Sequence, residues 1–290
     1  MKKVAIVTDT LSTIPRKIAE EHGIKLMPMY VVMDGKDYPE TEVDRRQLYD
    51  RIRRKDKSIT TSSPSPGDYL KAYQELSQKA ESILCITFAP SMGMAYKAAI
   101  QAAQIAQEEL PKAIIKVIDS RTVSVAQLLI VLAAAKAAAQ DKSLDEAVDI
   151  VNDMVAQLNF IDLVPTSGAN DLAKEGRAVS KSANGSKPRA MTHSVMEMSA
   201  STGGVMTIFA EVGSRAEGME KLIKIVRDRN QARSLHIAIS YSDTYDETKE
   251  LKRRLLSQFQ CIEIYLTEDS LIPTIHQGLG ALKLGWYSEE

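Results

Sequence analysis

Cysteine is scarce in this sequence. Only Cys85 and Cys261 occur among its 290 residues, and each lies in an apolar run that predicts a buried strand. This count argues against a disulfide framework and fits a reducing compartment. The four histidines are scattered without the spacing of metal ligands. With so few cysteines and no clustered histidine, no metal site is expected.

Long hydrophobic runs are also missing. The longest, Leu128 to Ala135, stops at Lys136 and falls far short of the roughly 18 apolar residues that a membrane-spanning helix needs. The start, with the apolar run Val4 to Val7, is too brief for the core of a secretory signal peptide. We therefore expect a soluble cytoplasmic protein.

Neither charge sign is in excess. Lysine and arginine number 37 against 38 acidic residues, so the formal net charge is −1 and no global basic field attracts nucleic acid or an anionic membrane. Any anion site must be local. No Gly-x-Gly-x-x-Gly or Walker sequence follows a predicted strand, and no Gly-x-Ser-x-Gly elbow occurs. What remains is ordinary globular composition, 44% hydrophobic and 26% charged, at a length that favours two domains.

The first half of the chain alternates short apolar runs with helical segments. After a first strand at 4–7, Ser12 or Thr13 can cap a helix that Gly23 ends, and Asp34-Gly35 predicts a hairpin turn. This order implies right-handed crossovers and a parallel sheet sandwiched by helices. Further strands are predicted at 24–33, 83–88 and 114–118, and helices at 44–54, 68–79, 91–109, 123–140 and 143–157.

The second half begins near Asn159, which predicts an N-terminal α/β domain over 1–158 and a C-terminal α/β domain over 159–290. A mixed sheet with helices is expected there, with strands at 160–164, 205–211, 235–240 and 262–266 and helices at 214–229 and 246–258. Residues 174–204 are polar with weak periodicity, which predicts a long loop. Its basic residues suggest a docking surface for an acidic partner or a plain solvated face; they are Lys174, Arg177, Lys181, Lys187 and Arg189.

Polar residues follow several predicted strands. Asp9 ends the first strand, and Asp119-Ser120 follow another, at the sheet edge where open α/β proteins bind ligands. An aspartyl nucleophile could lie there, but a carboxylate that orders its loop by accepting backbone N–H bonds is the simpler interpretation. Residues 60–67 combine hydroxyls, proline and glycine, which predicts an irregular loop and a first candidate site.

His276 is a candidate for ligand contact. It lies in Ile275-His276-Gln277-Gly278-Leu279-Gly280, where the glycines allow the backbone to approach a ligand closely. The Gly/Ser patches at 184–186 and 201–204 are weaker candidates for an anion cradle, because such patches are more often plain loops.

Four segments together resemble the landmarks of the DegV family, in order and spacing across essentially the whole chain. They are Thr8-Asp9-Thr10, Thr61-Ser62-Ser63-Pro64-Ser65, Ile118-Asp119-Ser120 with Val123-Ser124, and His276-Gln277-Gly278-Leu279-Gly280. The resemblance implies a bacterial protein that holds one long-chain fatty acid, such as palmitate, in a tunnel between two α/β domains. It also implies that a partner fatty acid kinase performs the chemistry, so that the chain is a carrier without catalysis and without a cofactor.

The same resemblance assigns roles to residues. Thr61 matches the threonine that bonds the fatty acid carboxylate, and His276 matches the histidine close to it. Arg215 falls in or beside the family's basic pair. Asp9, Ser62, Asp119 and Ser120 match positions of the supporting loops.

The sequence departs from the family pattern at the head group. Gly93 stands where the family has a serine, so only its backbone amide remains, and Ser91 is the nearest hydroxyl that could replace it. The family's Gly-Gly-Arg appears as Glu175-Gly176-Arg177. Lipid binding should survive these changes, because acyl burial contributes about 0.8 kcal/mol per CH₂ against about 0.5–1.5 kcal/mol for one hydrogen bond. Four methionines could line an adaptable tunnel or fill the core: Met27, Met29, Met92 and Met94.

Two other functions stay open at this point. Asp9 and Asp119 could serve a phosphatase-like or phosphotransferase enzyme, because both are carboxylates at strand ends. Because position 93 lacks the family serine, the chain could also be a binding module for another anionic small molecule.

Overall fold

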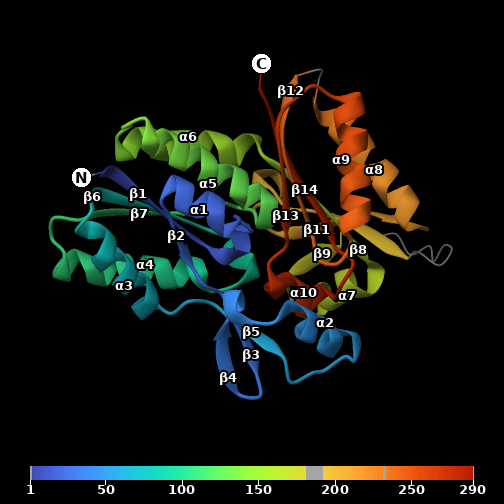
Figure 1. Cartoon of the computed structure of the whole chain (residues 1–290), viewed down its shortest axis with the longest axis horizontal. Coiled ribbons are helices and arrows are strands. Elements are labelled where there is room, and N and C mark those ends of the chain that lie inside the picture. Colours follow the sequence, from blue (N-terminus) through green and yellow to red (C-terminus); the bar gives the residue numbers. More distant parts are fainter. Residues whose placement is uncertain (1, 181–191, 231–232, 290) are drawn as a thin grey trace.

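The computed structural model describes residues 2–180, 192–230 and 233–289, and shows a mixed α/β protein with three sheets (Figure 1). Three basic residues of the suggested docking surface, Lys181, Lys187 and Arg189, lie outside the described residues, as does the Gly/Ser patch at 184–186. Among the described residues, no helix is long and apolar enough to cross a membrane.

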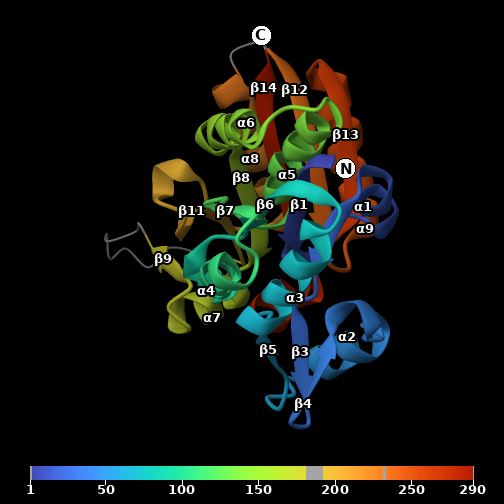
Figure 2. The same cartoon turned by 90° about the vertical axis from the view of Figure 1, so that its left-hand side faces the viewer.

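The first sheet is parallel throughout, with strand order β2-β1-β6-β7, as the alternation of strands and helices predicts. Helices cover both of its faces (Figures 1 and 2). The strands are β1 (Lys2–Asp9), β2 (Ile24–Met27), β6 (Ala80–Thr87) and β7 (Ile114–Asp119). The helices are α1 (Arg16–His22), α3 (Pro66–Ser77), α4 (Ala95–Glu109), α5 (Ser124–Ala139) and α6 (Leu144–Gln157).

Local signals position these helices. Gly23 ends α1 with a left-handed backbone, at φ +62°. The Ser143 and Glu146 capping box at the start of α6 is confirmed. The predicted caps of α1 are wrong, because Pro15 occupies that position and the chain between β1 and α1 first makes a short turn at Thr10–Ser12.

A small three-stranded sheet, order β4-β3-β5, projects from the rest of the molecule (Figure 1). Its β3 (Tyr30–Met33) and β4 (Lys36–Pro39) form the predicted hairpin around Asp34 and Gly35. Pro28 separates β3 from β2, so the single strand predicted over 24–33 is two strands in two sheets. The third strand is β5 (Thr60–Ser62), and α2 (Arg45–Arg53) lies beside this sheet.

The third sheet is mixed and has seven strands in the order β13-β12-β14-β8-β10-β11-β9. Two of its strands correct the long loop predicted over 174–204: β9 (Ala178–Ser180) pairs at the edge, and β10 (His193–Glu197) lies between β8 and β11. The others are β8 (Asn159–Pro165), β11 (Met206–Val212), β12 (Ser234–Tyr241), β13 (Cys261–Glu268) and β14 (Leu282–Glu289), with helices α7 (Thr166–Lys174), α8 (Arg215–Asn230), α9 (Tyr245–Gln258) and α10 (Leu271–Gln277).

Helix α5 lies between the parallel and the mixed sheet and contacts β1 on one side and β12 and β14 on the other. This position explains its composition, because a helix with sheets on two sides must be apolar nearly all round. Its residues from Ser124 to Leu132 are all buried. Gly285 of β14 lets α5 approach, since a Cβ atom there would lie 2.9 Å from the backbone nitrogen of Ala126.

Candidate functional site

Thr61 lies on a strand, which corrects the irregular loop predicted over 60–67. Strand β5 pairs antiparallel with β3, with Thr61 opposite the buried Val31. Ser65 then begins α3 with a capping box to Asp68, and Pro66 occupies the first helical turn. A strand and a helix therefore hold the hydroxyl-rich segment from both ends.

His276 meets Thr61 across 215 residues of sequence. It lies near the end of α10, whose next residue after the helix, Gly278, has φ +78°. The Thr61 Oγ1 atom is 2.8 Å from His276 Nε2. The imidazole is only 11% exposed, and burial together with the nearby Arg177 guanidinium lowers its pKa. The structure thus brings together two of the residues expected at the carboxylate, Thr61 and His276.

Glu175 and Arg177 complete this group, although no residue pattern predicted that Glu175 would lie beside His276. Both follow α7, where Gly176 turns the chain with φ +73°. Glu175 Oε2 lies 2.8 Å from His276 Nδ1 and 3.1 Å from Arg177 Nε. Arg177 also donates to the carbonyl oxygen of Met92. The resemblance pointed to this triplet, but only the fold shows that it reaches His276.

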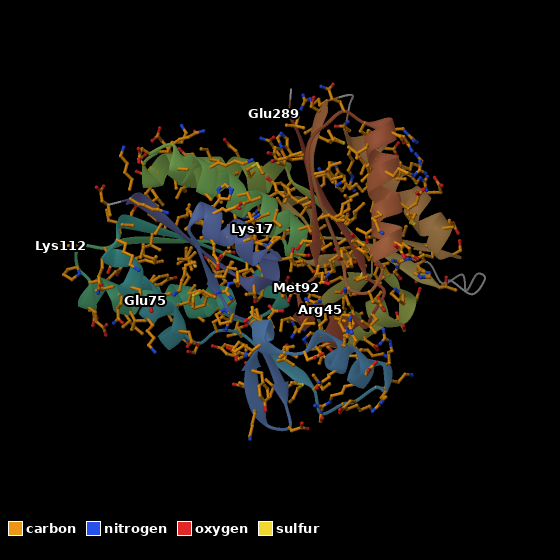
Figure 3. The ribbon with its side chains drawn as sticks, viewed as in Figure 1. Lys17, Arg45, Glu75, Met92, Lys112 and Glu289 are labelled. Carbon is orange, nitrogen blue, oxygen red and sulfur yellow. The ribbon has the colours of Figure 1, made fainter. Side chains whose placement is uncertain are left out.

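A cavity of about 450 Å³ adjoins the Thr61 side chain. This volume falls within the range of about 300–1,000 Å³ that is usual for small-molecule sites. Its walls combine apolar side chains with hydroxyls and one guanidinium, and they include Leu11, Met29, Ile272, Thr61, Ser62 and Arg177. Met92, near the centre of Figure 3, and Met94 also line it, whereas Met27 is buried in the core.

Gly93 lines the cavity beside Ser63. A Cβ atom at Gly93 would lie 3.2 Å from the Phe88 ring, so the absence of a side chain leaves space there. The Ser63 hydroxyl accepts a hydrogen bond from the Met94 N–H at the start of α4. Gly93 therefore remains a candidate for contact with a ligand through its backbone.

Two residues expected at the carboxylate lie elsewhere. The Ser91 hydroxyl donates to the Gly204 carbonyl oxygen at 2.5 Å, which turns it toward the mixed sheet. Arg215 begins α8, pairs with Glu247 at 2.7 Å and donates to the Gly280 carbonyl. It lines a separate cavity with Pro165 and Asp243. Neither side chain joins Thr61 and His276 in this structure.

The remaining predicted residues order the ends of the parallel strands. Asp9 is fully buried and accepts bonds from the Phe88 N–H and the Gln127 amide, and burial raises its pKa to about 7. Asp119 accepts from the Arg121 N–H at 2.7 Å, and the buried Ser120 hydroxyl donates to the Thr122 carbonyl.

The two strand-end carboxylates of the enzyme hypothesis are separated. Asp9 and Asp119 end strands that flank β6, so about two strand spacings of 4.8 Å lie between them. Asp119 lines a different cavity, together with Arg121. Among the described residues, no cluster of three or more histidine, cysteine, aspartate or glutamate side chains could hold a metal ion.

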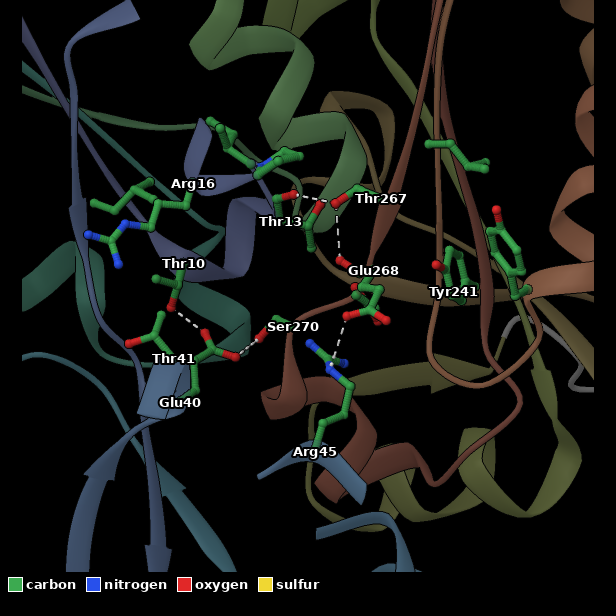
Figure 4. Close-up of a pocket in the computed structure, with 16 residues that line it drawn as sticks. Thr10, Thr13, Arg16, Glu40, Thr41, Arg45, Tyr241, Thr267, Glu268 and Ser270 are labelled. Atoms are coloured by element: carbon green, nitrogen blue, oxygen red, sulfur yellow. Dashed lines mark hydrogen bonds and ion pairs between the residues drawn. The ribbon is translucent and has the colours of Figure 1, made fainter. Parts of the chain in front are cut away.

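A second cavity, of about 550 Å³, lies between the first half of the chain and β13 (Figure 4). The buried Glu40 carboxylate reaches the Thr10 hydroxyl on one side and the Ser270 hydroxyl on the other, 2.6 Å away. Glu40 also accepts from the Leu271 N–H, so it holds the beginning of α10. Across the same cavity, Arg45 pairs with Glu268 at 3.3 Å.

Comparison with known proteins finds relatives over the whole chain. The family model described as "Uncharacterised protein, DegV family" matches residues 3–289. A DegV domain-containing protein of Clostridium perfringens is 24% identical over 287 residues, which cover 99% of each chain. Another, from Streptomyces coelicolor, is 25% identical and covers 97% of each chain.

Solved structures share this fold. A DegV family protein from Thermus thermophilus, whose structure concerns fatty acid binding, has a TM-score of 0.89 at 22% identity with all of both chains covered. A stearic acid-binding protein from Eubacterium ventriosum has a TM-score of 0.85 at 20% identity, covering 99% of this chain and 98% of the other. With a family model matching nearly every residue and the same fold in these proteins, the chain belongs to the DegV family.

Proposed function

We propose that this protein binds one long-chain fatty acid in the 450 Å³ cavity, with the carboxylate at Thr61 and the acyl chain among the apolar walls. The observation that carries the proposal is the Thr61–His276 pair, 2.8 Å apart, beside a cavity lined by leucine, isoleucine and methionine. Fatty acid binding is named for the similar structure from Thermus thermophilus, and stearic acid for the one from Eubacterium ventriosum, which supports the same ligand class.

The polar groups at this cavity suit a carboxylate. An anion that leaves water needs donors in place of its hydration shell. The Thr61 hydroxyl and the Arg177 guanidinium line the cavity, and charge-assisted bonds from arginine to carboxylates are among the strongest in proteins. The acyl chain should contribute most of the affinity, at about 0.8 kcal/mol per buried CH₂.

The same proposal includes the role of the protein as a carrier, its partner kinase and its location in the cytoplasm. The protein would present the carboxylate to a partner fatty acid kinase in the cytoplasm and perform no catalysis itself. The unpaired state of Cys85 and Cys261 supports a reducing compartment. Turnover of acyl substrate by the purified protein alone would contradict the carrier role.

The first experiment is mass spectrometry of an organic extract of the protein, purified without added lipid. We expect a stoichiometric long-chain fatty acid, whose length the spectrum reports. An extract without fatty acid, both before and after incubation with a fatty acid mixture, would contradict the proposal and favour another anionic ligand.

Thr61→Ala should weaken fatty acid binding about 2- to 10-fold, because one neutral hydrogen bond contributes about 0.5–1.5 kcal/mol. Displacement of a fluorescent fatty acid measures the affinity. Thr60→Ala is the matched control, since Thr60 lies on the same strand but is exposed. Equal affinities for the two variants would remove Thr61 from the site, and a thermal melt checks that both variants are folded.

A further inference from the structure

Both ring nitrogens of His276 are occupied by side chains. Nε2 faces the Thr61 hydroxyl and Nδ1 faces Glu175, each at 2.8 Å. The three groups come from β5, from α10 and from the chain just after α7, so they form a line that runs from the cavity wall through the buried imidazole to the exposed Glu175. Glu175 stands where the family pattern noted above has glycine, so this line is a property of this chain.

The chemistry of these groups fixes the tautomer of a neutral His276. An ionised Glu175 can only accept hydrogen bonds, so the proton must be on Nδ1. Nε2 is then an acceptor, and the Thr61 hydroxyl must donate its single proton to it. In this state the Thr61 oxygen presents only lone pairs to the cavity, which repel an incoming carboxylate.

A carboxylate can be bound by Thr61 only if the Thr61 proton turns toward it, which requires a proton on Nε2. Moving the proton from Nδ1 to Nε2 would leave the Nδ1 lone pair against the Glu175 carboxylate. The remaining arrangement is an imidazolium that donates to Glu175 and to the Thr61 oxygen, while Thr61 donates to the ligand.

We propose that Glu175 is a positioning residue that couples carboxylate binding at Thr61 to the uptake of one proton by His276. The inference rests on the proposed function, because it requires a carboxylate ligand in this cavity. The proton comes from solvent, adds to Nε2 and returns when the ligand leaves.

The charges around His276 are compatible with this coupling. Arg177 opposes the protonated ring, whereas Glu175 favours it, and both lie after α7. Two strands, β3 and β5, pack against α10 and contain no charged residue. Helix α7 also packs against α10, and its charged residues, Asp171 and Lys174, pair with each other at 2.9 Å. Burial lowers the pKa of His276 in the free protein, so the ring is neutral near pH 7 and has a proton to gain.

The test is the pH dependence of binding for wild type and Glu175→Gln, measured with cis-parinaric acid between pH 6 and pH 9. Wild-type affinity should fall up to about tenfold per pH unit above neutrality, as expected for uptake of one proton. The glutamine can turn its NH₂ group toward Nδ1, which permits the neutral Nε2–H tautomer. The variant should therefore bind with little pH dependence and more tightly than wild type at pH 9.

Calorimetry of laurate binding in buffers of different ionisation enthalpy counts the protons directly, with about one expected for wild type and none for Glu175→Gln. Glu108→Gln, an exposed change on α4, is the control and should match wild type. Wild-type binding without proton uptake, or the same pH profile in both proteins, would overturn this inference and leave the proposed function intact. Absence of binding by wild type at every pH would overturn the proposed function and this inference with it.

Discussion

At the scale of single residues, the polar side chains divide into those that face a cavity and those that hold the fold. Thr61 faces the cavity, whereas Asp9 is buried and accepts hydrogen bonds from the Gln127 amide and the Phe88 N–H. From the sequence, both were polar residues beside predicted strands. Their different roles depend on burial, which no local pattern specifies. The simpler interpretation of Asp9, a carboxylate that accepts backbone N–H bonds, fits its contacts.

Asp9 should make stability depend on pH. Burial raises its pKa from 3.8 to about 7, so the folded protein keeps a proton that the unfolded chain has released. Its contribution to stability therefore falls as the pH rises through this interval, by up to about 4 kcal/mol at about 1.36 kcal/mol per pH unit.

Urea unfolding of wild type and Asp9→Asn at several pH values measures this effect. The variant cannot ionise at position 9, so its stability relative to wild type should increase from pH 4 to pH 7. Burial also raises the pKa of Asp162 to about 7. Asp162 is present in both proteins, so its contribution cancels in the stability difference. A constant difference across this range would show that Asp9 does not titrate there. Asp37→Asn, an exposed change, is the control.

At the scale of helices and strands, the sequence predicts the elements that have apolar runs and clear caps well, and it predicts the strands that bury polar residues poorly. The alternating strands and helices of the first half are confirmed, because apolar runs and caps are local signals. Strands β10 and β14 escaped prediction because their polar residues are buried. Ser194 and Glu197 lie inside β10, and Lys283 of β14 is buried against Asp269. Only tertiary partners make such residues acceptable inside a sheet.

The close approach of α7 and α10 holds Glu175 and His276 together, and Gly168 allows it. A Cβ atom at Gly168 would overlap the backbone carbonyl of Gln277, which follows His276 directly. Gly168→Ala should therefore cost about 1–3 kcal/mol of stability, as overpacking does, and should weaken fatty acid binding.

Thermal unfolding and fatty acid displacement test this prediction. Gly67→Ala on α3 is a matched control, because the nearest atom to its added Cβ, Ser65 Oγ, is 3.6 Å away. Wild-type stability and affinity in Gly168→Ala would show that α7 can shift without disturbing the site.

At the scale of the whole molecule, helix α5 packs against two sheets. The division of the chain at 158 and 159 stays a prediction. The first two sheets use residues up to Asp119 and the third begins at Asn159, but α5 packs against both the parallel and the mixed sheet. Sequence patterns show where strands begin, whereas they do not show which sheets share a helix.

Sharing α5 should make the molecule unfold as one unit. Trp286, the single tryptophan, is fully buried in β14 and reports on the mixed sheet. Far-ultraviolet circular dichroism reports on helices throughout the chain. We expect the two urea transitions to coincide, as two-state unfolding requires. A Trp286 transition at a separate urea concentration would show that the mixed sheet unfolds independently.

The turn at Pro90–Met92 is fastened to the second half of the chain by two hydrogen bonds, from Ser91 to the Gly204 carbonyl and from Arg177 to the Met92 carbonyl. Because Met92 and Arg177 both line the cavity, these bonds close one of its walls. For a bound lipid, the consequence is kinetic. The residence time of the lipid would depend on how often these two hydrogen bonds break. Two ligands of equal affinity would therefore dissociate at different rates if only one of them displaces Arg177 from the Met92 carbonyl.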